Sequence, residues 1–79
     1  MKTLERIPEG YSIGRYLGKR YGISKTVFNQ GKSVKLYAEA LGDTDFVSLN
    51  YYSTEKAGLL KPCEMPKEKV LHFLKNVEL

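Results

Sequence analysis

Apolar and polar residues alternate over much of the chain, the pattern of antiparallel strands with one buried face. We expect strands over residues 10–16, 20–29, 34–40 and 45–53. The third is the clearest, because its apolar and polar residues strictly alternate: Val34, Leu36, Ala38 and Ala40 against Lys35, Tyr37 and Glu39. Successive side chains of a strand point to opposite faces, so this spacing predicts a sheet with one apolar face.

The turn at residues 29–32 fixes the register of the second and third strands. Gly31 stands where a short hairpin turn needs a positive φ. A two-residue loop of Gln30 and Gly31 places Val27 opposite Val34 and pairs the residues before and after them in step. The first hairpin, which turns at residues 17–20, stays open, because a two-residue and a three-residue loop send Ile13 to opposite faces.

The residues of "GDTD" (42–45) favour a turn, because Asp and Thr bond locally to the backbone and Gly accepts a positive φ. A four-residue turn there predicts the register of the third and fourth strands. Its expected pairs are Ala40 with Val47, Ala38 with Leu49, Leu36 with Tyr51, Tyr37 with Asn50 and Lys35 with Tyr52.

The C-terminal third predicts a helix over residues 66–79. Pro66 suits the first helical turn, where its missing N–H costs nothing. An apolar stripe follows at i, i+3, i+4 and i+7: Val70, Phe73, Leu74 and Val77. Before it, Pro62 limits residues 59–63 to a short edge strand or an extended connector. The predicted fold class is therefore α+β: a four-stranded antiparallel meander with one C-terminal helix (β-β-β-β-α) and room for a short extra strand near 59–63.

If the helix covers the apolar face, aromatic and polar residues are left on the other. Tyr37, Phe46 and Tyr52 stand there among hydroxyls, Asn50 and Lys35. Exposed aromatics beside lysine are typical of surfaces on which the bases of single-stranded nucleic acid stack. Two other interpretations stay open: an interface with a protein, including a second copy of this chain, and a plain exposed sheet.

The length and charge of the chain limit the functions it can have. Seventy-nine residues make one small domain, 1–79, in which we expect residues 1–9 to be a flexible tail. A core this small is marginal, so a homodimer is expected to add stability. Residues 1–41 hold eight Lys and Arg against three Glu, a basic half that suits phosphate binding. The candidate phosphate contacts are Arg15, Arg20, Lys25, Lys32 and Lys35.

The single cysteine is the weak candidate for chemistry. Cys63 lies three residues before the predicted helix, where the helix dipole would favour a thiolate. His72 lies on the polar side of that helix, with no geometric reason to reach it. One Cys and one His cannot complete a zinc site, and we expect no metal and no cofactor. With no apolar run that could span a membrane and no secretory signal, we expect a cytoplasmic protein.

The order of the elements resembles that of the positive-cofactor-four family of transcriptional coactivators. The shared features are four strands, a basic first half and a final segment, "CEMPKEKVLHFL", that runs through a proline into a helix. This resemblance implies a homodimer that binds single-stranded DNA through its sheet and its basic hairpins.

Three stretches, "YGISKTVFNQGKSVKLYAEALG", "DFVSLNYY" and "LKPCEMP", are similar to a group of short bacterial proteins often labelled peptide methionine sulfoxide reductase. That label implies a thiol-dependent oxidoreductase, for which Cys63 is the only thiol in the chain. The sequence thus gives three candidate functions: single-stranded nucleic acid binding, thiol-dependent reduction, and a protein–protein adaptor or inhibitor.

Overall fold

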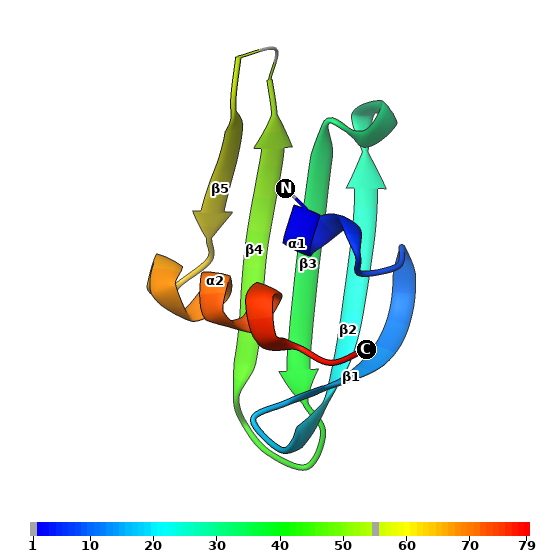
Figure 1. Cartoon of the computed structure of the whole chain (residues 1–79), viewed down its shortest axis with the longest axis vertical. Coiled ribbons are helices and arrows are strands. Elements are labelled where there is room, and N and C mark those ends of the chain that lie inside the picture. Colours follow the sequence, from blue (N-terminus) through cyan, green and yellow to red (C-terminus); the bar gives the residue numbers. More distant parts are fainter. Residues whose placement is uncertain (1, 55) are drawn as a thin grey trace.

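The computed structural model describes residues 2–54 and 56–79, and it confirms the α+β fold (Figure 1). Five strands form one antiparallel meander in the order β1-β2-β3-β4-β5, and the C-terminal helix lies across one face. The elements are α1 (Lys2–Glu5), β1 (Gly10–Tyr16), β2 (Lys19–Phe28), the 3-10 turn η1 (Asn29–Gly31), β3 (Ser33–Ala40), β4 (Phe46–Ser53), β5 (Gly58–Pro62) and α2 (Lys67–Asn76). The segment around Pro62 is thus an edge strand.

The first hairpin turns through two residues. Leu17 and Gly18 both have a positive φ, 52° and 75°, and Tyr16 pairs with Lys19. This is the backbone form that matches the twist of the flanking strands. The open question of register is thereby settled: Tyr16 joins the buried face, and Ile13 lies on the opposite face.

The second hairpin has the predicted register. Val27 pairs with Val34 and Ile23 with Ala38. Gln30 and Gly31 occupy the turn with φ of 56° and 91°, as a turn of this kind requires.

The predicted register of the third hairpin is wrong by two residues. Ala38 pairs with Val47, and Tyr37 lies opposite Ser48 instead of Asn50. The loop comprises residues 41–44, because the Ala40 amide donates to the Asp45 carbonyl (2.9 Å) and the Asp45 side chain is held from elsewhere in the fold. A shift of two residues keeps every side chain on its predicted face, so the face assignment survives the error.

The core lies between the sheet and α2. Val70, Phe73 and Leu74 of the helix are fully buried against Leu36 and Leu49 of the central strands. Aromatic side chains extend this core toward the β1–β2 end, where Tyr16, Tyr21 and Phe73 meet edge to face.

The helix is shorter than predicted, and its end joins the sheet. Val77 is extended rather than helical, and Glu78 exchanges two backbone hydrogen bonds with Arg15 of β1 (2.7 and 2.8 Å). Gly14 makes room for this segment, since a Cβ there would lie 3.0 Å from Val77 and 3.1 Å from the Glu78 carbonyl oxygen. Tertiary pairing with β1 therefore ends the helix at Asn76.

Residues 2–9 belong to the segment expected to be a flexible tail, and residues 2–7 are packed against the fold. Leu4 and Ile7 are buried in the core. The Arg6 guanidinium donates to the carbonyls of Leu74 and Val77 (2.9 and 2.6 Å), which are left unpaired at the end of α2. The segment is a strap bound across the helix-covered face; Met1 lies outside the described residues.

Candidate nucleic-acid interface

The sheet face turned away from α2 is open, and its side chains form cross-strand rows. We call it the open face, and the helix-covered side the closed face. The strand registers define five rows on the open face: Arg15–Arg20; Ile13–Gly22–Glu39–Phe46; Tyr11–Ser24–Tyr37–Ser48–Cys63; Thr26–Lys35–Asn50–Lys61; and Phe28–Ser33–Tyr52–Leu59.

The centre of the open face is aromatic. The rings of Tyr37 and Phe46 stack at 6.0 Å between centroids with 26° between their planes. Tyr37 keeps 40% of its surface exposed and Tyr52 keeps 39%, so both rings offer a face to a ligand. Lys69 of α2 reaches to 6.0 Å from the Phe46 centroid, although its charge is paired with that of Asp45. The three aromatics predicted for this face all lie on it.

Cations stand on both sides of the aromatic centre. Arg15 and Arg20 pair across β1 and β2 beyond the Phe46 row, while Lys35 and Lys61 share the row on the other side of Tyr37. All four are exposed, and Glu39 is the only acidic residue in the five rows. Lys32 is exposed at the β2–β3 turn, next to the row of Tyr52. The open face therefore carries a net positive charge suited to phosphate groups.

Lys25 does not belong to this surface. It lies on the closed face with 9% of its surface exposed, and its ammonium group donates to the carbonyls of Leu4 and Ile7 (3.0 and 2.8 Å). The predicted register, which sets Lys25 opposite Leu36, already puts its side chain on the apolar face. The sequence still suggested a surface cation, because it does not show the strap that covers Lys25. Its role is to hold the strap.

Cys63 continues the Ser48 row beside β5. Its amide donates to the Ser48 carbonyl (3.0 Å), and its thiol accepts a hydrogen bond from the Asn50 amide (3.3 Å). The thiol is half-buried. Among the described residues it has no hydrogen bond with a histidine or carboxylate, because His72 instead bonds to Tyr16 through Nδ1. Within the described residues, no hydrogen-bonded histidine or carboxylate therefore lies beside the thiol.

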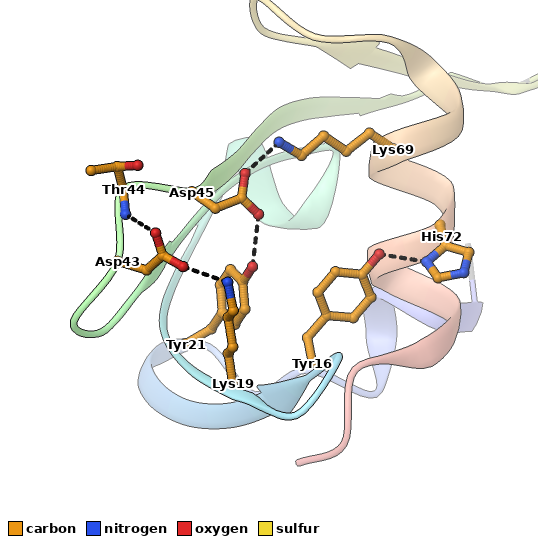
Figure 2. A network of polar contacts seen from close by, with 8 residues as sticks. All are labelled: Tyr16, Lys19, Tyr21, Asp43, Thr44, Asp45, Lys69 and His72. Carbon is orange, nitrogen blue, oxygen red and sulfur yellow. Dashed lines mark hydrogen bonds and ion pairs between the residues drawn. The ribbon is translucent and has the colours of Figure 1, made fainter.

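A second set of polar residues joins the first hairpin, the β3–β4 loop and α2 (Figure 2). The Asp45 carboxylate accepts hydrogen bonds from the Tyr21 hydroxyl (2.7 Å) and the Lys69 ammonium group (2.6 Å). These contacts, that of Lys69 first, hold the pKa of Asp45 below its ordinary value. Burial, and then the Asp45 carboxylate, raise the pKa of Tyr21. A tyrosine in this state stays protonated and acts as a hydrogen-bond donor, so we interpret the network as structural.

The other contacts of this network also connect parts of the fold. Lys19 forms an ion pair with Asp43, which raises the pKa of Lys19 and lowers that of Asp43. Asp43 also accepts from the Thr44 amide (2.7 Å). Burial raises the pKa of Tyr16, whose hydroxyl is bonded to His72 of α2. Together these contacts position the β3–β4 loop and the helix against the first hairpin.

Sequence reasoning did not assign Tyr11, Ile13 and Lys61 to the open face. Tyr11 and Ile13 were not assigned because the register of the first hairpin was open. Lys61 was missed because β5 was not certain to be a strand, although its spacing of two residues from Cys63 puts both on one face.

No protein-family model matches the chain, and neither curated proteins nor solved structures show a significant similarity to it. The two resemblances noted from the sequence therefore stay predictions. Within residues 2–54 and 56–79, no group of three or more His, Cys, Asp or Glu side chains could hold a metal ion. In the same residues no helix has the length and apolar character needed to cross a membrane.

Proposed function

We propose that this protein binds single-stranded nucleic acid on its open face. The observation that carries the proposal is the stack of the exposed Tyr37 ring on the half-buried Phe46 ring, flanked on one side by Arg15 and Arg20 and on the other by Lys35. Aromatic rings stack on any base, and cations at either side attract the backbone, so the ligand would be recognised with little sequence preference.

The rigidity of the sheet supports this function. Tyr37 and Phe46 project from adjacent strands of a ladder that is covered from behind by α2, so the rings are held in place before a ligand arrives. Pre-organised side chains lose little conformational entropy on binding. Tyr52 lies farther along β4, with Lys35 and Lys61 in the row between it and Tyr37, and would stack a further base.

The test is fluorescence anisotropy with a labelled oligonucleotide of about 12 nucleotides, a length that covers the site sizes usual for such surfaces. We expect binding that weakens with salt. Tyr37→Ala should weaken it by about 1–3 kcal/mol, or about 5- to 150-fold, the usual cost of losing one stacked base. Lys35→Ala should weaken it less at high salt than at low salt.

The matched control is Lys75→Ala, which removes an exposed cation from α2 on the closed side. It changes the net charge as Lys35→Ala does and should leave the affinity nearly unchanged. Absence of binding at low salt would overturn the proposal, as would equal effects of Lys35→Ala and Lys75→Ala. The open face would then be a surface for a protein partner or a plain exposed sheet.

The proposal places the protein in the cytoplasm, where single-stranded nucleic acid occurs and a lone thiol stays reduced. It also includes a homodimer, in which two open faces would serve one strand. Two adjacent sites on one ligand bind with higher avidity than either alone.

A further inference from the structure

The two edges of the sheet are protected to different degrees (Figure 1). β5 is five residues long and contains Lys61 and Pro62, which are usual protections against pairing with another chain. Over residues 10–14, β1 contains no charge and no proline. Its side chains on the open face are Tyr11, 64% exposed, and Ile13, 42% exposed. β1 is therefore the edge at which a further strand could add.

The backbone groups available on β1 are confined to a short stretch. The N–H and C=O groups of Arg15 bond to Glu78, which shows that they point away from β2. Backbone direction alternates along a strand, so the N–H and C=O groups of Tyr11 and Ile13 point outward as well. Glu78 closes the edge at one end, and Gly10, whose φ is 95°, begins the strand at the other. What is left accepts about five residues of another strand.

Between Tyr11 and Ile13 lies an unsatisfied hydroxyl. Ser12 Oγ is buried and, among the described residues, has no hydrogen-bond partner. A buried hydroxyl without a partner is costly, so its presence beside an unpaired edge indicates a missing contact. Ser12 pairs with Ile23 of β2 and so projects from the closed face of the edge strand.

We propose that β1 pairs with β1 of a second copy of this chain, antiparallel, with Ser12 on the two-fold axis. Tyr11 of each copy then lies opposite Ile13 of the other, and the outward groups of these residues form the ladder. The two Ser12 side chains face each other, and rotation about χ1 lets the hydroxyls bond. The two sheets become one continuous sheet, with both open faces on the same side.

The surface beside this edge fits a second copy. A hollow of about 300 Å³ lies at this edge, lined by Ile13, Gly14, Arg15, Arg20, Glu78 and Leu79. In the proposed register the partner's Tyr11 lies opposite Ile13, at the rim of this hollow. The pairing is thus self-complementary in backbone hydrogen bonds and in apolar contact. It does not depend on nucleic acid binding.

The test is sedimentation velocity of the full chain without nucleic acid, from about 1 µM to 1 mM, the range in which a small interface associates. We expect the mass to rise from one copy to two. Ile13→Lys should raise the dissociation constant at least about tenfold, because it puts the two introduced cations at diagonal positions across the axis and removes the apolar contact with the partner's Tyr11. The matched control is Leu59→Lys, the same change at an exposed open-face position of the other edge strand. It should leave the constant unchanged.

Ser12→Ala gives a second, independent readout. In a monomer it removes a buried hydroxyl that has no partner, so monomer stability should not fall. In the dimer it removes the hydrogen bond across the axis, so the dissociation constant should rise. A wild-type chain that stays monomeric up to about 1 mM overturns the proposal and leaves the edge to a strand of another protein. A dimer that Leu59→Lys weakens and Ile13→Lys does not overturns it too.

Discussion

At the scale of single residues, Asp45 joins three parts of the molecule. It follows the β3–β4 loop, accepts the Tyr21 hydroxyl from β2 and the Lys69 ammonium group from α2, and its backbone carbonyl pairs with Ala40. The Tyr21 side chain is buried, so its hydroxyl needs this acceptor. Lys69 and Asp45 are each more than a third exposed, and solvent limits what their ion pair contributes.

Asp45 should make stability depend on pH on the acid side. Its pKa is lower in the folded than in the unfolded protein, so its stabilising effect is complete above about pH 5 and is lost as pH falls below about 4. Asp45→Asn keeps an acceptor for Tyr21 but loses the charge, and should lower the free energy of unfolding at pH 7 by less than about 1 kcal/mol. Urea unfolding from pH 7 to pH 3 measures this.

The difference between Asp45→Asn and wild type should disappear toward pH 3. Glu39→Gln is the control, because Glu39 lies exposed on the open face and makes no ion pair within the described part of the chain. A constant difference at all pH values would show that the amide disturbs the loop, not that a charge was lost.

At the scale of elements, the strap of residues 2–9 and the end of α2 are linked by cations that bind carbonyl groups. Lys25 binds the strap, and Arg6 of the strap binds the last turn of the helix. Helix ends and short helices leave carbonyls without intrahelical partners, and a cation satisfies them without a matching acid. These contacts let the strap, whose helix α1 has only four residues, stay ordered.

Two lysine substitutions should separate folding from binding. Lys25→Met leaves the carbonyls of Leu4 and Ile7 without their donor, and should cost about 1–3 kcal/mol of unfolding free energy. It should leave nucleic acid affinity unchanged, because Lys25 lies on the closed face. Lys35→Met should weaken nucleic acid binding and leave the unfolding free energy unchanged, because Lys35 is exposed on the open face. Urea unfolding and anisotropy on both variants measure this, and the opposite pattern would show that the faces are wrongly assigned.

At the scale of the whole molecule, the protein is a thin slab, 39 × 24 × 18 Å, with one face used for folding and the other free. One helix and the strap are enough to bury the closed face. The open face keeps aromatic and basic residues that the core does not need. The helix and the strap cover the closed face and leave part of the β1 edge unpaired. A second copy can therefore extend the sheet at β1 without covering the open face.

Salt dependence should report the number of phosphates that one copy contacts. The rows of the open face hold four cations, Arg15, Arg20, Lys35 and Lys61. Each phosphate contact with a single strand contributes about −0.7 to the slope of log affinity against log salt, so the slope should not exceed about −3 per copy. Lys61→Ala should reduce its magnitude by about 0.7. Anisotropy titrations at several salt concentrations measure it, and a slope beyond about −6 would mean that cations elsewhere bind the strand.

Several local features of this fold follow from the sequence alone. The alternation of Val34 to Ala40 assigned both faces of β3, and Gly31 fixed the turn before it, because each depends on neighbouring residues only. The assignment of Tyr37, Phe46 and Tyr52 to one face has the same origin. It survived a register error of two residues, since side chains repeat their direction every second residue.

Contacts between distant residues decided the rest. The loop before β4 was displaced because Asp45 is held by Tyr21 and Lys69, which are 24 residues away in either direction. The helix ended at Asn76 because Glu78 pairs with Arg15, and Lys25 was buried because the strap folds over it. Such contacts are absent from any local window of sequence. Periodicity therefore determined which residues share a face, and tertiary structure determined their register, where the helix ends and which cations stay free to bind.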